Sequence, residues 1–233
     1  MSTKPEAVVA LFDMDGTLFS GDSQLRFARW ILRRHGWRRL YLFLLIPCGV
    51  LRALRILDTP RMKRAFLSYA WGMNKEDLLA ECREFVRQEL LPESFAPVLE
   101  RLKAHQQAGD TTILCSASPH WWVQFYGQAL GFTHTIGTPI ETSGRVELFP
   151  SIPAPGNNKG ANKLLRLAQI GITAADIGYT DSRADLPMLS ICRRAVLIHP
   201  SNALLNAVPN AEIMTPPGSV RKIAFTLGCL LGI

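Results

Sequence analysis

The chain has 233 residues, enough to bury a full hydrophobic core and to form one large domain or one domain with an insert. Its apolar fraction of 48% and charged fraction of 19% are typical of a folded protein, which excludes a disordered chain. The net charge of +7 is concentrated in residues 26–64, where eleven Lys or Arg residues accompany a single acid, Asp58.

Cysteine usage and the N-terminus indicate a compartment. The five cysteines are odd in number, widely scattered and without Cys-x-x-Cys spacing, which argues against a disulfide framework or a zinc site. The first residues lack the long apolar core and the cleavage site of a secretory signal. We therefore expect a cytoplasmic protein, with peripheral attachment to the inner face of the cytoplasmic membrane as an alternative.

Four short apolar runs predict buried strands. Residues 7–12, AVVALF, form an uninterrupted apolar run that ends at an aspartate, as in a strand buried on both faces of a parallel sheet. Runs at 111–118, 177–180 and 195–198 have the same character. Because helical patterns alternate with these runs, we predict an α/β fold with a Rossmann-like, doubly wound parallel sheet, whose ligands bind beyond the carboxyl ends of the strands.

About ninety residues separate the first two predicted strands, far more than a crossover between parallel strands requires. Helical patterns fill this stretch. We therefore predict an inserted all-helical cap over residues 22–91, and an α/β core made of residues 1–21 and 92–233. Further on, a Ser-Gly turn between short alternating runs at 138–150 predicts a hairpin.

Polar side chains follow the predicted strands at the edge where these end. Asp13 and Asp15 follow the first strand, Ser116 the second, and Asp181 and Asp185 a later one. Carboxylates crowded at the end of a buried strand repel one another and lose hydration, so they need a cation. Three runs that deliver polar residues to the same edge predict one site there.

Such a site suits the hydrolysis of phosphate monoesters. Asp13, at the strand end, is placed to attack phosphorus in line once a cation neutralises the incoming anion. Asp15 is placed for proton transfer, and Asp181 and Asp185 would complete an oxygen-rich magnesium site. A single Asp-x-Asp pair is also common in turns, so this prediction depends on all three clusters together.

The clusters resemble the motifs of the haloacid dehalogenase (HAD) superfamily. DMDGTL at 13–18 is similar to the first motif of that family, ILCSAS at 113–118 to the second, and GYTDSRADLPML at 178–189 to the fourth. The motifs occur in order, and the match spans residues 7–200. The helical insert between the first two motifs is similar to the C1-type cap of the phosphoserine phosphatase-like branch, subfamily IB.

The resemblance implies catalytic and metal-binding roles. Asp13 would form a phosphoaspartate, and Asp15 would act as general acid and then as base toward the hydrolytic water. Magnesium would be held by the Asp13 carboxylate, the Asp15 backbone carbonyl and Asp181, with Asp185 as a further ligand.

The resemblance also implies a phosphate site made of Ser116, the backbone N–H of Ala117 and a lysine of the third motif. Lys163 stands in a Gly-x-x-Lys-apolar pattern like that of many relatives, whereas the spacing of Lys159 is closer to that of phosphoserine phosphatases. Either lysine would lie near a helix N-terminus, a favourable place for an anion. We favour Lys163 and keep Lys159 as the alternative.

The predicted cap departs from those of the phosphoserine enzymes. Only one acid, Asp22, follows the first motif before the charge turns basic, and residues 40–51 form an uncharged run of twelve. That run is too short to span a bilayer and indicates a core or interfacial helix. Trp30, Trp37 and Tyr41 stand beside arginines, as in segments that lie on anionic lipid.

This composition resembles the branch that includes phosphatidylglycerophosphatase C, so our main hypothesis is a lipid phosphate substrate such as phosphatidylglycerophosphate. A small soluble phosphomonoester, phosphoserine-like, is the alternative. A membrane-surface binding protein with a vestigial site and a phosphotransferase that uses an alcohol acceptor are two further hypotheses. The expected partners are a phosphorylated small molecule or lipid and an anionic membrane surface, and we find no nucleic-acid module.

Overall fold

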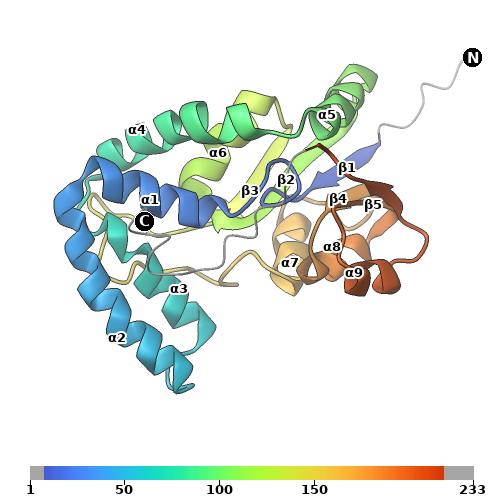
Figure 1. Cartoon of the computed structure of the whole chain (residues 1–233). Helices are drawn as coiled ribbons and strands as arrows, with labels where there is room; N and C mark the ends of the chain where they lie inside the picture. The colour runs from blue at the N-terminus through green and yellow to red at the C-terminus, as the bar shows by residue number, and fades with distance from the viewer. Residues whose placement is uncertain (1–7, 218–233) are drawn as a thin grey trace, which may run out of the picture.

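The computed structural model describes residues 8–217, and a six-stranded sheet lies at its centre. The strands are β1 (Val9–Phe12), β2 (Thr111–Pro119), β3 (His134–Thr138), β4 (Ala175–Thr180), β5 (Cys192–Ile198) and β6 (Glu212–Met214). They pair in the order β3-β2-β1-β4-β5-β6, and every pair is parallel. The predicted doubly wound parallel sheet is therefore confirmed (Figure 1).

Helices cover both faces of the sheet (Figure 1). One face carries α5 (Ala96–Ala108) and α6 (His120–Leu130), and the other carries α7 (Ala161–Gln169), α8 (Leu186–Leu189) and α9 (Asn202–Ala207). Successive residues of β1 point to opposite faces, so Phe12 packs in the same cluster as Leu102 of α5, whereas Leu11 packs in that of Leu167 of α7. Because both faces need apolar side chains, β1 has the uninterrupted run noted in the sequence.

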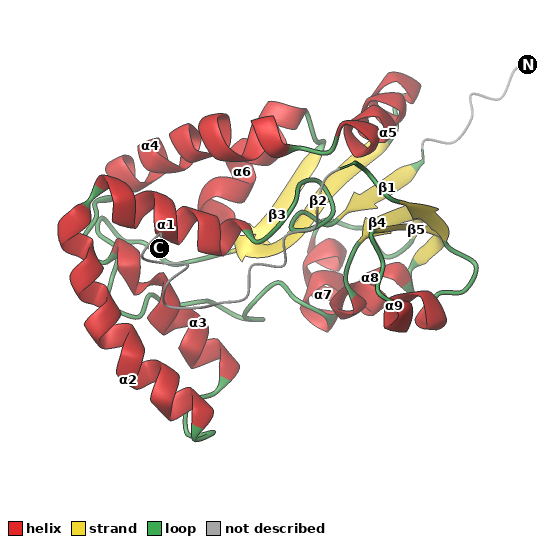
Figure 2. Ribbon diagram, in the orientation of Figure 1, coloured by secondary structure: helices red, strands yellow, loops and turns green. Residues whose placement is uncertain are grey.

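The chain between β1 and β2 is helical, as predicted. It contains α1 (Ser23–Arg34), α2 (Tyr41–Ala53), α3 (Thr59–Leu67) and α4 (Lys75–Phe85), joined by single-turn helices and short loops (Figure 2). Side chains cap the N-termini of three of these four helices. The side chain of Asp22 accepts a hydrogen bond from Leu25 N at 3.0 Å, that of Asp58 from Arg61 N at 2.8 Å, and that of Asn74 from Asp77 N at 3.0 Å.

The chain enters and leaves this helical segment at neighbouring points. Phe19 and Ser94 form an antiparallel bridge, and Phe95 N donates to the carbonyl of Leu18 at 2.7 Å. The division of the chain into a cap at 22–91 and a core around it stays a prediction, which this pairing supports. The outermost parts of the predicted core, 1–7 and 218–233, lie outside the described residues.

An aromatic cluster holds the helical segment against α6. Phe27 of α1 lies 4.8 Å from Trp122 of α6 and 5.0 Å from Phe85 of α4, measured between ring centroids. Aromatic contacts at these distances contribute about 0.5–1.5 kcal/mol each beyond the area they bury. The cluster therefore fixes the start of α1 beside the end of β2.

The hairpin predicted at 138–150 is wrong. Within the loop, Ser143 and Arg145 form a bridge around Gly144 and Glu141 N donates to Ser151 O at 3.0 Å, but no strand forms. The backbone groups instead pair with the start of α4 and the turn before it: Gly72 N donates to Val146 O at 2.8 Å, Val146 N to Met73 O at 2.9 Å, and Lys75 N to Gly144 O at 2.8 Å. Since the helical segment satisfies these groups, the loop has no need of a partner strand of its own.

Candidate active site

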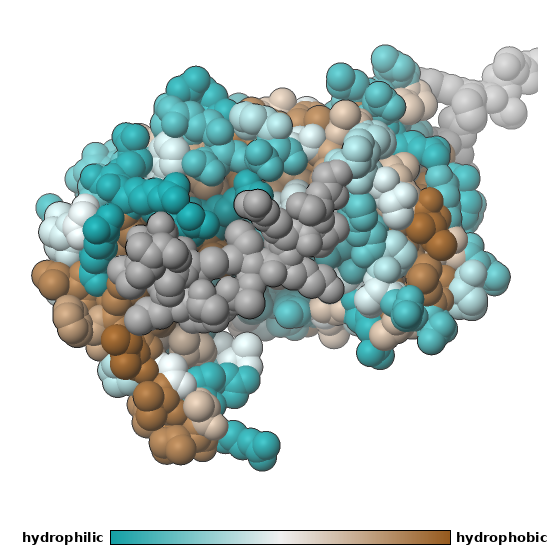
Figure 3. Space-filling model, viewed as in Figure 1, coloured by the Kyte–Doolittle hydropathy of each residue, from teal (hydrophilic) through white to brown (hydrophobic). Residues whose placement is uncertain are grey.

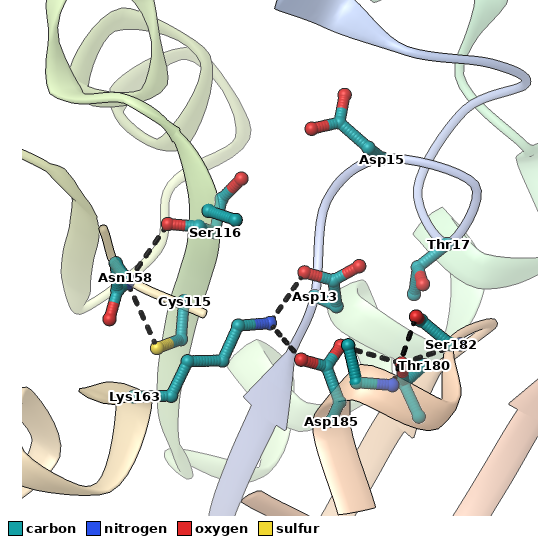
Figure 4. A network of polar contacts seen from close by, with 12 residues as sticks. Asp13, Asp15, Thr17, Cys115, Ser116, Asn158, Lys163, Thr180, Ser182 and Asp185 are labelled. Atoms are coloured by element: carbon teal, nitrogen blue, oxygen red, sulfur yellow. Dashed lines mark hydrogen bonds and ion pairs between the residues drawn. The ribbon is translucent and has the colours of Figure 1, made fainter. Parts of the chain in front are cut away.

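The structure brings the predicted site residues to one edge of the sheet (Figure 4). Asp13 follows the end of β1, and the chain then turns at Gly16, whose φ of 78° is in the left-handed region. Asp181 follows the last residue of β4, and Ser116 lies near the end of β2. Parallel strands bring their carboxyl ends together, which is why residues far apart in sequence meet here.

Lys163 lies in the first turn of α7 and is buried between two carboxylates. Its Nζ is 2.7 Å from Oδ1 of Asp13 and 2.7 Å from Oδ1 of Asp185 (Figure 4). Thr180 Oγ1 donates to the other oxygen of Asp185 at 2.8 Å. Lys159, the alternative, precedes the helix and is exposed at the rim of a neighbouring pocket. The contacts therefore favour Lys163 over Lys159.

The carboxylates at this edge carry more negative charge than the lysine balances. Burial raises the pKa of Asp13 well above its usual value, against the attraction of Lys163, and Asp185 and Asp181 raise it further. Burial also raises the pKa of Asp181 to about 7, with Asp185 and Asp15 adding to the rise. Burial opposes the charge of Lys163 as well, but attraction to Asp13 and Asp185 outweighs it and raises the lysine pKa.

Asp181 fits a cation. Its Oδ1 is buried and has no hydrogen-bond partner, while a Cβ at Gly16 would lie 2.3 Å from its Oδ2. Among residues 8–217, no three His, Cys, Asp or Glu side chains are grouped closely enough to hold a metal by themselves. A divalent ion at this edge would thus need a backbone oxygen beside the Asp13 and Asp181 carboxylates, in line with the carbonyl that the resemblance implies for Asp15.

The Asp15 side chain points away from Asp13 and Lys163 (Figure 4) and is held by a relay of hydrogen bonds. Ser118 Oγ donates to Asp15 Oδ2 at 2.6 Å, and Ser23 N donates to Oδ1 at 2.7 Å. Ser23 Oγ lies 2.9 Å from Ser118 Oγ and accepts from Trp122 Nε1 at 3.0 Å. Burial, and then the charge of Asp22, raise the pKa of Asp15 to about 6 against these bonds.

The phosphate-binding segment predicted at Ser116 and Ala117 is supported by two asparagines that the sequence analysis did not single out. Asn158 Nδ2 donates to Ser116 O at 2.9 Å (Figure 4), and Asn157 Oδ1 accepts from Thr138 Oγ1 at 2.8 Å. These bonds tie the end of β2 to β3 and to the loop before α7.

A pocket of about 430 Å³ opens beside Asp15, between the helical segment and the sheet edge. Its core side contains Ala117, Ser118 and Asn157, and its helical side contains Asp22, Gln24, Leu25, Arg52, Thr59, Met62, Lys63 and Phe66. Lys63 Nζ donates to the carbonyl of Ala117 at 2.7 Å and to Asn157. Burial lowers the pKa of Lys63 to about 8, although Asp15 and Asp22 act in the opposite direction.

Sequence reasoning missed Lys63, which was one of eleven basic residues in its segment. A signal was present in its spacing. Thr59, Met62, Lys63 and Phe66 follow the i, i+3, i+4, i+7 pattern of one helix face, and all four line the pocket. Asp22, which the sequence analysis left without a part in the chemistry, also lines the pocket.

The fold and the carboxylate-rich strand edge define a hydrolase of the α/β type, and a comparison with protein families agrees. Residues 10–190 match the model of the haloacid dehalogenase-like hydrolases, so the chain belongs to this family. The chain is 27% identical over 219 residues to a histidinol-phosphatase of Neisseria meningitidis, covering 84% of this chain and 92% of that one. It is 26% identical over 204 residues to a phosphoserine phosphatase of Mycobacterium tuberculosis, covering 84% of this chain and 66% of that one.

Solved structures agree on the fold. A Bordetella pertussis protein of unknown function superposes with a TM-score of 0.75 at 22% identity, covering 90% of this chain and 99% of that one. A probable phosphoserine phosphatase from Vibrio cholerae superposes with a TM-score of 0.64 at 16% identity, covering 98% of this chain and 65% of that one. The predicted superfamily and enzyme class, a phosphatase, are thereby confirmed.

Proposed function

We propose that this chain is a magnesium-dependent phosphatase that hydrolyses a small, soluble phosphate monoester through a phosphoaspartyl intermediate on Asp13. The observation that carries the proposal is the buried Lys163, held 2.7 Å from both Asp13 and Asp185 at the carboxyl edge of the sheet. The charge of Lys163 lowers the pKa of Asp13 against the effect of burial, and so favours the ionised carboxylate that must attack phosphorus.

The reaction has two displacements. A carboxylate oxygen of Asp13 attacks phosphorus in line, the ester P–O bond breaks, and Asp15 donates its proton to the leaving oxygen. Asp15 then takes a proton from water, which attacks the phosphoaspartate, so that phosphate leaves and the Asp13 carboxylate is restored. Its pKa of about 6 lets Asp15 exchange a proton in either direction near neutral pH.

Magnesium would be held by the carboxylates of Asp13 and Asp181 and by the backbone carbonyl of Asp15. When bound, it supplies positive charge that screens the phosphoryl oxygens from the carboxylates. Ser116, the N–H of Ala117 and Lys163 would bind the phosphoryl oxygens. Since Lys163 and Thr180 engage both oxygens of Asp185, we assign Asp185 the positioning of Lys163 in place of the direct metal contact implied by the resemblance.

The comparisons favour the small-substrate alternative over the lipid phosphate of our main hypothesis, because the two curated relatives described above are named for histidinol phosphate and phosphoserine. Both compounds carry an amino group close to the phosphate ester. In the pocket, Asp22 offers a carboxylate to such a group, and Lys63 offers a cation to a second anionic group. We therefore propose an amino-substituted phosphate monoester as the substrate class.

A panel of phosphate esters tests this proposal. With magnesium, we expect phosphoserine and histidinol phosphate to be hydrolysed faster than glycerol phosphate, glucose 6-phosphate or phosphatidylglycerophosphate in micelles. Chelation with EDTA should lower kcat at least about 100-fold, because the cation contributes several kcal/mol to the transition state, and added magnesium should restore it. Phosphate release is the measurement.

An Asp22→Asn variant serves as the control for substrate class, since it should lower the ratio of kcat/KM for phosphoserine to kcat/KM for glycerol phosphate. The ratio is the readout because Asp22 also raises the pKa of Asp15, which affects both esters alike. Turnover of the lipid phosphate alone would contradict the proposed substrate. Undiminished activity in EDTA, or no turnover of any ester, would contradict the proposed mechanism. Added alcohol acceptors distinguish hydrolysis from phosphotransfer by their phosphorylated products.

Lys63 predicts a pH dependence of substrate binding. Because its pKa is lowered to about 8, Lys63 loses its positive charge as the pH rises through 8, and the KM for an anionic ester should rise with it. A Lys63→Arg variant stays charged at these pH values and should remove that rise. Lys103→Met, at an exposed position of α5, is the matched control and should behave as the parent. An unchanged rise in Lys63→Arg would rule out this role.

A further inference from the structure

The outer side of α2 and its flanking turns exposes a row of large apolar side chains. We call this row the outer ridge: Trp37, Leu40, Phe43, Ile46, Val50 and Leu54, with exposed fractions between 48% and 73%. Figure 3 shows brown, apolar residues gathered along the lower left arm, where α2 lies in Figure 1. Steps of three and four residues place these side chains on one face of a helix. A row of this kind marks an interaction surface in a folded protein.

The opposite side of α2 already forms its part of the core. Leu42, Leu45 and Cys48 are buried against the helical segment, so the ridge is additional apolar surface that the fold does not use. A helix that is apolar on both sides is expected between two apolar layers. In the described part of the chain, only one of those layers is present.

Positive charge surrounds the outer ridge. Arg39 is exposed at the N-terminal end of α2, and Arg55 is exposed just beyond its C-terminal end. Asp58 is the only acid between residues 26 and 64. A second copy of this chain seated on the ridge would bring these arginines against one another, which costs free energy. Charge complementarity therefore favours an anionic occupant.

The ridge has the dimensions of a helix that lies on a bilayer. No helix among residues 8–217 is long and apolar enough to cross a membrane. The 13 residues of α2 extend about 20 Å, and the helix contains Pro47. Of the three aromatic residues that the sequence suggested for lipid contact, Trp30 and Tyr41 are buried, whereas Trp37 is exposed and is joined by the exposed Trp71.

These two tryptophans flank an apolar pocket of about 270 Å³ at the start of α2. Its wall also includes Leu40, Leu44 and Leu148. Such a pocket accepts hydrocarbon and offers little to a polar ligand. Exposed tryptophan at an apolar surface is a feature of the membrane–water interface.

We propose that the outer ridge docks this protein on the surface of an anionic phospholipid bilayer. The apolar side chains enter the boundary between headgroups and acyl chains, and Arg39 and Arg55 contact the lipid phosphates. The docking does not depend on which ester the enzyme hydrolyses.

Vesicle sedimentation tests the docking. The full chain should sediment with vesicles of phosphatidylglycerol and phosphatidylcholine, and far less with phosphatidylcholine alone. A Phe43→Ser/Ile46→Ser variant should bind roughly 100-fold more weakly, because two large apolar side chains no longer leave water. An Arg39→Glu/Arg55→Glu variant should bind at least about tenfold more weakly, and high salt should weaken binding of the parent.

Ile213→Ser, which removes an exposed apolar side chain of β6 far from α2, is the matched control and should bind as the parent. Thermal unfolding of each variant checks that its fold is retained. Absence of parent binding to anionic vesicles at low salt would overturn the proposal, as would equal binding to neutral vesicles. A third outcome would also overturn the proposal. If the parent forms dimers, and the Phe43→Ser/Ile46→Ser variant loses dimerisation but keeps vesicle binding, the outer ridge serves self-association.

Discussion

Replacement of Asp13 by asparagine is expected to lower kcat for phosphate-ester hydrolysis by a factor of about 10⁴ or more. The amide keeps the size of the carboxylate but has no negative charge with which to attack phosphorus. Lys163 retains its contact with Asp185, so the fold should be preserved. Steady-state phosphate release is the measurement, with thermal unfolding as the check on folding.

A trapping experiment distinguishes loss of the nucleophile from a general loss of activity. In the parent enzyme, rapid acid quenching should capture phosphate on the protein in a form that hydroxylamine releases, as expected of an acyl phosphate. The Asp13→Asn protein should capture none. Asp77→Asn, at an exposed position in the first turn of α4, is the matched control and should keep full activity. Full activity in Asp13→Asn would remove Asp13 as the nucleophile.

Replacement of Lys163 by methionine is expected to lower the free energy of unfolding by about 3 to 5 kcal/mol at neutral pH, because it leaves Asp13 and Asp185 buried without their shared cation. Activity should be lost as well. Urea unfolding in the presence of EDTA is the measurement, since a bound metal would otherwise neutralise the carboxylates.

The loss of stability in Lys163→Met should depend on pH. Without the lysine, nothing offsets the burial that raises the pKa of Asp13, so the native variant binds a proton that the unfolded chain releases above a pH of about 4. The uptake of this proton stabilises the native variant at low pH, and the stabilisation is lost as the pH rises. The difference in the free energy of unfolding between parent and variant should therefore be smaller at pH 5 than at pH 8. A further Asp185→Asn change should recover part of the stability at pH 8. A difference that stays constant with pH would contradict the ion-pair account.

The sheet and the edge at which the polar residues meet could be predicted from the sequence because they depend on local signals. An uninterrupted apolar run such as 7–12 followed by an aspartate identifies both a strand and the edge at which it ends. Asp13, Ser116 and Asp181 each follow such a run, and parallel topology brings them together. Their separation along the chain was therefore no obstacle to predicting that they meet.

The choice between Lys159 and Lys163 could not be made in the same way. Both lysines stand close to the start of the same apolar helical pattern. In the structure α7 begins at Ala161, so Lys163 is in the helix and Lys159 precedes it. The start of α7 is fixed by the fold of the loop before it, through the hydrogen bonds of Asn162 to the carbonyls of Pro155 and Asn157. The structure thus supplied a boundary that the sequence pattern leaves open.

Contacts between the helical segment and the sheet were also beyond the sequence. Lys63 and the loop around Gly144 owe their positions to partners about 50 to 100 residues away, at Ala117, Asn157 and Lys75. No local pattern encodes such pairings. The apolar run at 40–51 posed a related problem, because periodicity cannot say that one face of α2 is buried and the other exposed.

The neighbouring linkers at Phe19 and Ser94 bear on how such enzymes diversify. Because the helical segment leaves and rejoins the sheet at adjacent points, its insertion or exchange leaves the spacing of β1 and β2 untouched. The carboxylates to which we assign catalysis come from the sheet edge, whereas Asp22 and Lys63 come from the helical segment itself. Selection on substrate and selection on chemistry therefore act on separable stretches of the gene, and a new segment grafted at these two points would inherit the reaction while changing what it acts upon.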